Sequence, residues 1–251
     1  MSLKPARATL TSTSEPPVPL DIFIHESLAN LARPAWVSEV VCPLRWIPQP
    51  VAPIRDGYGV WLDHGGAALL LPNGPEPLHL PVPEIAVREK GGNLLLRACT
   101  PRGRSNLRLL DACAGFGLDG LILAQRHEVT MVDRAPIVHV LQTELCARAG
   151  EKVAHLLGVA EQHMHEDAWD VIYLDPMFPA RSKTALPKLA MQHLRALAQT
   201  TSPAGLDALL EQARETAIER VVLKRRAKDP VAGKPSFSLR GRTVRFDVYQ
   251  S

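Results

Sequence analysis

The chain has 251 residues, of which 46% are hydrophobic and 22% are charged, and its formal net charge is +3 at pH 7. These values are typical of a globular protein and exclude a wholly disordered or fibrous chain. No apolar run reaches the roughly 18–20 residues that cross a bilayer, and the first residues lack the apolar segment of a secretory signal. We therefore expect a cytoplasmic protein with no membrane partner.

The N-terminal part of the chain, residues 1–85, is expected to be small and rich in short strands. Fourteen of the 22 prolines precede residue 84, which disfavours long helices there. Residues 1–20 are polar and contain several prolines, as is typical of a mobile tail. Residues 59–71 place two apolar runs around a Gly-Gly pair, a pattern that predicts a β-hairpin.

From residue 86 onward the sequence alternates between strand and helix patterns. Continuous apolar runs separated by helices of ten or more residues favour an α/β fold with a parallel sheet covered on both faces. The last run alternates and follows a loop, which favours an antiparallel strand. The predicted strands are 107–113, 128–133, 170–175, 219–225 and 243–250, and the predicted helices are 118–126, 135–150, 184–199 and 204–218.

A glycine-rich loop follows the first of these strands. Gly115, Gly117 and Gly120 form the pattern G-x-G-x-x-G between a strand and a helix, where glycine lets the backbone turn sharply and approach a ligand. Asp133 ends the next strand, a position from which an acid commonly accepts hydrogen bonds from ribose hydroxyls. The pattern therefore predicts a site for a nucleoside cofactor.

Two nucleoside cofactors fit this loop, a dinucleotide such as NAD and S-adenosylmethionine (SAM). A dinucleotide places its pyrophosphate at the helix N-terminus, whereas SAM carries an ammonium group that an acid can hold. Asp111 ends the strand just before the glycines, where it suits an ammonium and repels a pyrophosphate, so SAM is favoured. Asp119, in the first turn of the following helix, either reaches the cofactor or only interacts with the helix dipole.

The third predicted strand ends in Asp175-Pro176-Met177-Phe178-Pro179. In an open α/β sheet, ligands bind at the carboxyl ends of the strands. The Asp-Pro turn fixes a carboxylate and a carbonyl that can accept hydrogen bonds from an amine, and Phe178 can stack on a base. We expect Asp175, Pro176 and Phe178 to catalyse methyl transfer to an exocyclic amine through proximity and orientation. The alternative is an ordinary turn with Phe178 in the core.

Together these motifs carry a resemblance that covers residues 88–250. The segments DACAGFGLDGLILA, VDRAPIV, VIYLDPMFPARSKTAL, RVVLKRR and RFDVY resemble the RsmJ family of bacterial 16S rRNA (guanine-N2)-methyltransferases. The resemblance implies a Rossmann-like class I methyltransferase domain over residues 86–251, with SAM as cofactor. It also implies that 16S rRNA or the small ribosomal subunit is the partner, and that a guanine N2 amine near the 3′ end of this RNA accepts the methyl group.

The resemblance further implies particular cofactor-binding residues. Five residues match binding positions of the family: Leu118, Asp119, Asp133, Arg134 and Asp175. The match is inexact at Asp133, where the family carries Glu. The segment after Asp133 is also shorter than in the family, and a pair of serines that contacts the cofactor there has no clear counterpart. Glu166 or Asp167 is the candidate replacement, accepting from the adenine amine.

Positive charge is concentrated near the C-terminus. Residues 181–251 hold 14 Lys and Arg against 6 Asp and Glu, a net charge of +8, whereas the other 180 residues hold 15 and 20, a net charge of −5. Such asymmetry suggests a polyanionic partner, and a solvated face on a mildly basic protein is the alternative. Two basic clusters follow strands at the active edge and are expected to hold RNA phosphates: Arg181, Lys183 and Lys188, and Lys224, Arg225 and Arg226.

The four cysteines lie far apart and the nine histidines show no metal-ligand spacing, so we expect no metal site.

Three functions compete with the one implied above. An NAD-type oxidoreductase would use the same glycine pattern but leaves residues 175–179 unexplained. A non-catalytic RNA-binding or ribosome-assembly protein would retain the fold, and a methyltransferase on the same fold would act on another RNA guanine or amine.

Overall fold

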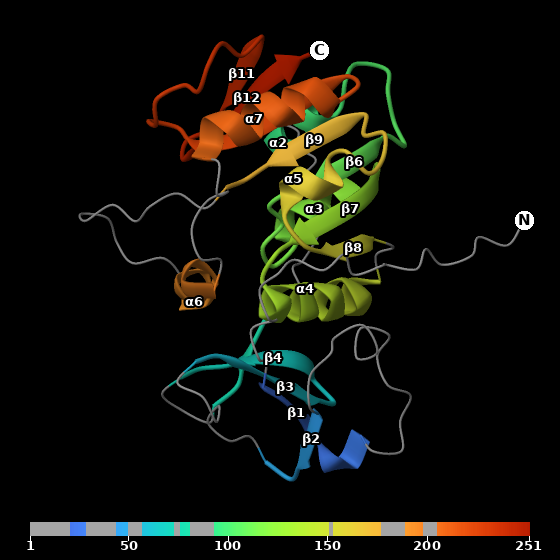
Figure 1. Cartoon of the computed structure of the whole chain (residues 1–251), viewed down its shortest axis with the longest axis vertical. Coiled ribbons are helices and arrows are strands. Elements are labelled where there is room, and N and C mark those ends of the chain that lie inside the picture. The colour runs from blue at the N-terminus through green and yellow to red at the C-terminus, as the bar shows by residue number, and fades with distance from the viewer. Residues whose placement is uncertain are drawn as a thin grey trace, which may run out of the picture.

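The computed structural model describes residues 21–28, 44–49, 57–72, 76–80, 93–150, 153–176, 189–197 and 205–251. The tail expected at residues 1–20 lies outside these ranges. The described strands form one sheet of five strands and one of seven. Figure 1 shows the two sheets stacked along the long axis of the molecule, with helix α4 (Pro136–Ala149) between them.

The five-stranded sheet belongs to the N-terminal region and has the order β2-β1-β3-β4-β5. The predicted hairpin at 59–71 is confirmed, because β3 and β4 pair antiparallel around a tight turn. The parallel pairing of β1 with both β2 and β3 was not predicted. The elements of this sheet are β1 (Asp21–His25), the 3-10 helix η1 (Glu26–Leu28), β2 (Leu44–Ile47), β3 (Gly59–Asp63), β4 (Gly66–Leu70) and β5 (Leu78–His79).

The seven-stranded sheet has the order β11-β12-β10-β9-β6-β7-β8. Neighbours from β10 to β8 are parallel, and β12 is antiparallel to both β10 and β11, as predicted for the C-terminal strand. The chain moves outward from β6 to β8 and then returns to β9 on the other side of β6, which creates a switch point. The strands are β6 (Arg108–Asp111), β7 (Glu128–Asp133), β8 (Ala154–Leu157), β9 (Val171–Leu174), β10 (Arg220–Arg226), β11 (Phe237–Arg240) and β12 (Val244–Gln250).

The predicted helices are present, three of them with shorter bounds, while the ends of the helix predicted at 184–199 fall partly outside the described residues. α4 begins with Pro136 and ends at Gly150, whose φ of 73° is the left-handed conformation that favours glycine at a helix end. The short helices α2 and α5 were not predicted. The remaining helices are α2 (Leu94–Cys99), α3 (Leu118–Ala124), α5 (Ala160–His163), α6 (Leu189–Leu197) and α7 (Gly205–Thr216). None of these described helices is long and apolar enough to cross a membrane.

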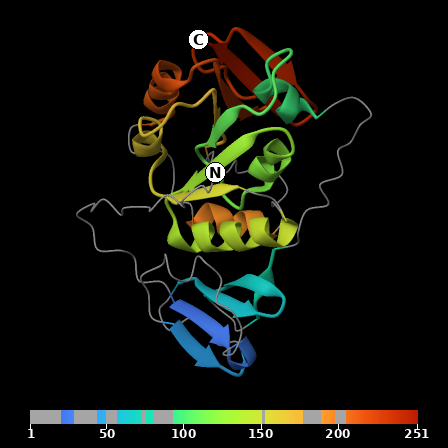
Figure 2. The ribbon, with the colours of Figure 1, turned by 90° about the vertical axis from the view of Figure 1, so that its right-hand side faces the viewer.

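Helix α4 joins the two sheets through a shared core. Val60 and Leu69 of the N-terminal sheet and Leu141 of α4 are buried in one apolar cluster that continues into the seven-stranded sheet. At the other end of the helix, Arg148 donates hydrogen bonds to the carbonyls of Gly65 and Leu80, each at 3.1 Å. Figure 2 shows α4 between the sheets from a second direction. The N-terminal sheet is therefore held on the same helix that covers the seven-stranded sheet.

Candidate active site

Charged side chains converge at one edge of the seven-stranded sheet, beside the switch point between β6 and β9. Asp111 ends β6, Asp133 ends β7 and Asp175 directly follows β9. Asp119 reaches the same edge from the first turn of α3, and Lys224 reaches it from β10. The structure therefore brings together the acids that the sequence analysis singled out. Open α/β sheets bind their ligands at this edge.

Asp111 is buried and has no hydrogen-bond partner in the described part of the chain. Only 1% of the surface of Asp111 is exposed, and neither of its carboxylate oxygens has a hydrogen-bond partner among the described residues. Burial raises the pKa of Asp111 well above its usual value, as do the negative charges of Asp119 and Asp175. The charge of Lys224 acts in the opposite direction, as does the nearby N–H dipole of Cys113, which does not reach hydrogen-bond geometry with either oxygen. Buried polar groups are nearly always hydrogen-bonded, so this carboxyl group indicates a place where a ligand supplies the missing donor.

The glycine loop is shaped by backbone geometry and close packing. Gly115 and Gly117 have φ values of 54° and 79°, in the left-handed region that favours glycine. A Cβ atom on Gly120 would lie 2.2 Å from Cε of Met131, so this glycine lets α3 pack closely on β7. The first two glycines therefore form the turn, and the third serves helix–sheet packing.

The underside of the loop is held by Gln142 of α4, which the sequence analysis missed. Its Nε2 donates to the carbonyl of Gly115 at 2.9 Å, and its Oε1 lies 3.1 Å from Nδ1 of His155. Burial lowers the pKa values of His155 and the adjacent His139 to about 4, so both rings are neutral at pH 7. Gln142 is fully buried, and a polar residue on the inner face of the predicted helix was the one feature of the sequence that could have pointed to its role.

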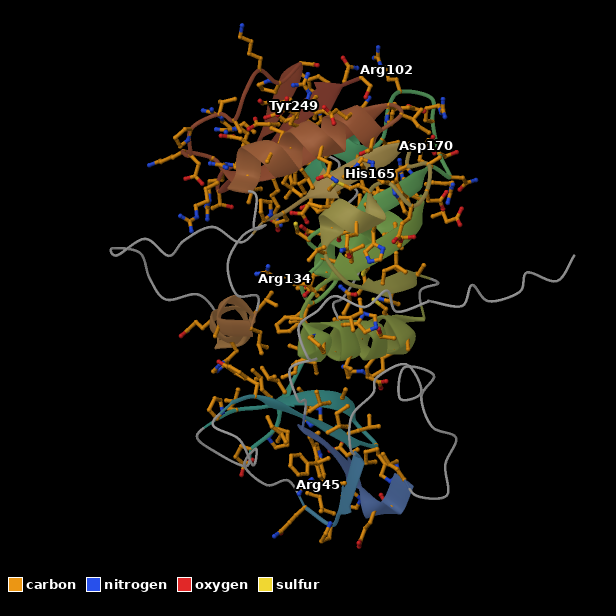
Figure 3. All side chains as sticks on the ribbon, in the orientation of Figure 1. Arg45, Arg102, Arg134, His165, Asp170 and Tyr249 are labelled. Atoms are coloured by element: carbon orange, nitrogen blue, oxygen red, sulfur yellow. The ribbon has the colours of Figure 1, made fainter. Side chains whose placement is uncertain are left out.

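Asp133 is oriented by the same loop. Its Oδ2 accepts from the Gly115 N–H at 3.2 Å and its Oδ1 accepts from the Ala135 N–H at 2.8 Å. Burial raises the pKa of Asp133 to about 6, although these N–H groups act in the opposite direction. A carboxylate has about four lone-pair sites, so Asp133 retains acceptor capacity for ribose hydroxyls. Figure 3 shows Arg134, the following residue, on the side of the sheet where α6 lies.

Lys224 connects two of the site carboxylates. Its Nζ lies 2.5 Å from Oδ2 of Asp119 and 2.9 Å from Oδ2 of Asp175, and the Tyr173 hydroxyl donates to the same Asp119 oxygen at 2.5 Å. Burial alone lowers the pKa of Lys224, but Asp175 and Asp119 outweigh it and the net shift is upward. Burial and Asp119 raise the pKa of Asp175 to about 6, against the opposing charge of Lys224.

The basic cluster Lys224–Arg226, predicted to follow a strand, lies within strand β10 instead. These residues do not follow β10 but form its last three positions, because β12 pairs with β10 as far as Arg226 and Val244. The ammonium group of Lys224 lies inside the site and is paired with two carboxylates, so it is not a surface group waiting for RNA.

The structure describes some of the remaining predicted site residues and not others. Pro176 is buried and is the last described residue after β9, whereas Phe178, Arg181, Lys183 and Lys188 lie outside the described residues. Leu118 begins α3 and is 43% exposed, an apolar side chain that suits contact with an adenosine. Among the described residues, no cluster of His, Cys, Asp or Glu is suited to hold a metal ion.

Asp167 does not take the place of the missing serine pair. It forms an ion pair with Arg108, which begins β6 at the opposite edge of the sheet from Asp111. Glu166 is occupied with His163, whose Nδ1 lies 2.6 Å from its Oε2. The residue that follows β8 at the site edge is instead Gly158, whose N–H donates to the carbonyl of Asp133 at 3.1 Å.

These residues fit SAM. The unpartnered Asp111 suits the ammonium group, and Asp133 suits the ribose. Comparison with known proteins agrees: a family model of SAM-dependent methyltransferases matches residues 85–251. The ribosomal RNA small subunit methyltransferase J of Thioalkalivibrio sulfidiphilus is 34% identical, covering 80% of this chain and 84% of that protein. The protein of the same name from Alkalilimnicola ehrlichii is 33% identical, with coverages of 97% and 88%.

The fold has a solved counterpart of similar length. The crystal structure of a SAM-dependent methyltransferase from Neisseria gonorrhoeae superimposes with a TM-score of 0.64 at 25% identity, covering 92% of this chain and 95% of that chain. The sheet order, the glycine loop and the acids at the carboxyl edge define a class I methyltransferase that uses SAM. Within that class, the chain belongs to the ribosomal RNA small subunit methyltransferase J family. The expected fold, enzyme class and cofactor are thereby confirmed, and the NAD-dependent and non-catalytic alternatives are set aside.

Proposed function

We propose that this enzyme methylates the N2 amine of a guanine near the 3′ end of 16S rRNA, within the small ribosomal subunit. The names of the relatives support small-subunit rRNA as the substrate. The observation that carries the proposal is the carboxylate of Asp175, fixed by Lys224 at the end of β9. It lies at the same edge as Asp111, which lacks a partner among the described residues.

The geometry supports particular residues as the ones that would hold SAM. Asp111 would accept from its ammonium group, Asp133 from its ribose hydroxyls, and Leu118 would cover part of the adenosine. Asp119 is bonded to Lys224 and Tyr173, so its contribution is to hold this wall of the site. When bound, SAM supplies an electrophilic methyl group on its sulfonium sulfur. The remaining task for the chain is to present a nitrogen lone pair in line with that methyl group.

The exocyclic amine of guanine is a weak nucleophile because its lone pair is delocalised into the ring. A base taken out of its stack exposes both amine hydrogens to the site. A carboxylate that accepts one of these hydrogens orients the amine and raises the electron density on nitrogen. The amine loses one proton in the exchange, and Asp175, with its pKa raised to about 6 by burial, can hold it. The carbonyl of Asp175, fixed by Pro176, and stacking on Phe178 complete the proposed orientation.

The proposal also includes the surroundings of the site. Arg181, Lys183, Lys188, Arg225 and Arg226 are proposed to contact rRNA phosphates, whereas Lys224 is proposed to position Asp175. Residues 1–85 are proposed as an N-terminal region that precedes a methyltransferase domain at 86–251 and packs on it through α4, and the family match that begins at residue 85 supports this boundary. We place the enzyme in the cytoplasm, where ribosomes are assembled.

The test is methyl transfer from labelled SAM to small ribosomal subunits that lack the modification, followed by mass spectrometry of the nucleosides. The wild-type enzyme is expected to produce N2-methylguanosine. Asp175→Ala and Asp175→Asn should each lower turnover by about 100-fold or more, as expected for loss of a positioned base. Calorimetric SAM titration and thermal melting of each variant control for folding. A different methylated nucleoside would indicate another amine substrate, and wild-type turnover in Asp175→Ala would refute the mechanism.

A further inference from the structure

A second hollow lies at the amino edge of the seven-stranded sheet, away from the methyl-transfer site. Its volume is about 850 Å³, and its walls come from α2, the loop before β6, the turn before β7, and the ends of β10, β11 and β12. Of the described residues that line it, five are arginine and none is Asp or Glu. We call it the arginine groove, and its defining residues are Arg97, Arg102, Arg104, Arg126, Arg220 and Phe237.

Three of these arginines leave their charge uncompensated. Arg97, Arg102 and Arg126 are exposed, and their guanidinium groups form no hydrogen bond or ion pair within the described part of the chain. Arg104 is the member with an ion pair, to Glu219 at 2.6 Å. A concave surface with uncompensated arginines attracts a polyanion. Because guanidinium groups bind phosphate in a bidentate way, a phosphate backbone fits this surface.

The floor of the groove gives an independent indication. Arg220 is 7% exposed, its Nη1 donates to the carbonyl of Ala98 at 3.0 Å, and its Nε has no partner among the described residues. No carboxylate in the described part of the chain forms an ion pair with it. Glu219, the neighbouring residue that pairs with Arg104, acts on Arg220 only through its charge and forms no ion pair with it in the described part of the chain. Buried charges are normally paired, so this guanidinium, whose Nε has no partner among the described residues, leaves room for an anion in the groove.

An exposed aromatic ring lies beside these charges. Phe237, the first residue of β11, lines the groove and is 38% exposed. Proteins that bind single-stranded nucleic acid combine a positive groove with aromatic rings on which bases stack. A small inorganic anion would have no use for this ring, so the combination favours a nucleic acid strand.

We propose that the arginine groove binds the sugar-phosphate backbone of the substrate RNA, with Phe237 stacking on an unpaired base. The proposal rests on the proposed function, because it identifies that RNA as small-subunit rRNA. Figure 3 shows Arg102 and Asp170 on one side of the sheet and Arg134 on the other, so the groove and the site lie at opposite edges. Arg220 and Lys224 are four residues apart in β10, a span of about 13 Å along a strand.

This separation is short for a nucleic acid. A duplex strand rises about 3.4 Å along its axis per nucleotide, so the two edges are separated by about the rise of four stacked nucleotides. Because the RNA must pass around the outside of the sheet, the proposal needs a longer rRNA segment, anchored in the groove while a guanine of the same RNA enters the site. The groove would contribute to RNA affinity, and the site to the chemical step.

The experiment measures RNA binding directly, with a transcript of the 3′ domain of 16S rRNA in a filter-binding assay at several salt concentrations. The double variant Arg102→Glu/Arg126→Glu should weaken binding by about tenfold or more. The slope of log K against log salt, which is negative, should become shallower by about two. Its KM for small subunits should rise while kcat and SAM affinity are kept. Phe237→Ala should weaken binding several-fold with an unchanged salt slope, because stacking releases no counterions. Arg45→Glu is the matched control, since Arg45 is exposed on β2, far from the groove.

The outcomes separate this proposal from the proposed function. Unchanged affinity and salt slope in the double variant overturn the groove, whether or not the wild-type enzyme methylates rRNA. If the double variant binds RNA weakly but the wild type produces no N2-methylguanosine, the groove stands and the proposed reaction falls. An equal loss of affinity in Arg45→Glu would mean general charge attraction and would also overturn the groove.

Discussion

Asp111 is the residue to which we attribute the preference for SAM over a dinucleotide. It is buried, it lacks a hydrogen-bond partner among the described residues, and two other acids lie near enough to raise its pKa. A pyrophosphate would add further negative charge at this point, whereas an ammonium group supplies donors and a compensating charge. The same electrostatics link SAM binding to proton release, because an ammonium next to Asp111 favours its ionised form.

We therefore expect SAM binding at pH 7 to release protons from the fraction of Asp111 that is protonated, because burial raises the pKa of this carboxyl group well above its usual value. At that pH Asp133 and Asp175 are mostly ionised, because burial raises their pKa values only to about 6, and the α-amino group of SAM is already mostly protonated. Calorimetric titration in two buffers with different ionisation enthalpies measures the release. Asp111→Asn should bind SAM more weakly and release no proton. Equal proton release in this variant would show that another group titrates.

Lys224 acts at the same scale through its charge on Asp175. A carboxylate that must accept a hydrogen bond is active only above its pKa, so turnover should rise with pH through about 6. Without the ammonium, desolvation and Asp119 act unopposed, and the pKa of Asp175 should rise by a further 1–3 units or so. Lys224→Met should therefore be slow at pH 7 and recover towards pH 9, while Lys224→Arg should keep most of the wild-type pH profile.

A pH profile of kcat for the three enzymes tests this. An equal loss of kcat at every pH in Lys224→Met would contradict electrostatic positioning and indicate a collapsed site. SAM titration of each variant shows whether the cofactor site itself is intact.

At the scale of elements, the sequence was informative where strands are buried on both faces. The strands β6, β7, β9 and β10 are apolar runs, and the bounds of each were predicted to within two residues, those of β7 without error. β8 and β11 are half-buried or exposed and carry no such run, so local pattern could not reveal them. The parallel pairing of β1 depends on contacts between distant residues, which composition does not encode. Gln142 escaped notice because its role depends on the neighbouring loop.

The C-terminal motif RFDVY shows how a family signature can be structural. Arg245 and Asp247 are 2% and 0% exposed and form a two-point ion pair, with Nε–Oδ1 and Nη2–Oδ2 distances of 2.8 Å. Arg245 also donates to the carbonyl of Asp229 at 2.9 Å, which ties down the segment after β10. The Tyr249 hydroxyl donates to the carbonyl of Ala232 in the same segment.

Removing one partner of this pair should be costly. Arg245→Met leaves the Asp247 carboxylate buried without its counter-charge, and we expect a loss of about 3–5 kcal/mol in the free energy of unfolding. The double variant Arg245→Met/Asp247→Leu should recover part of that loss, because neither charge then remains buried alone. Urea unfolding of the three proteins measures both values. A single-variant loss below about 1 kcal/mol would contradict the assignment of this motif to stability.

At the scale of the whole molecule, helix α4 couples the cofactor site to the N-terminal sheet. Gln142 on one turn of α4 holds the glycine loop, and Arg148, nearly two turns later, holds the carbonyls of Gly65 and Leu80. Apolar residues of both sheets pack on the helix within one buried cluster. Because dense cores transmit displacement rather than absorb it, loosening either sheet from α4 should disturb the other.

This arrangement predicts that the two sheets unfold together and that SAM stabilises both. Three of the four tryptophans, Trp36, Trp46 and Trp61, belong to the first 85 residues, so fluorescence reports mainly on the N-terminal region, whereas far-ultraviolet circular dichroism reports on the whole chain. The two unfolding transitions should coincide. SAM at 100 times its Kd should raise the free energy of unfolding by about 2.7 kcal/mol by both probes. If SAM shifted the dichroism transition and left the fluorescence transition in place, the N-terminal sheet would be an independent unit and α4 would not couple it to the site.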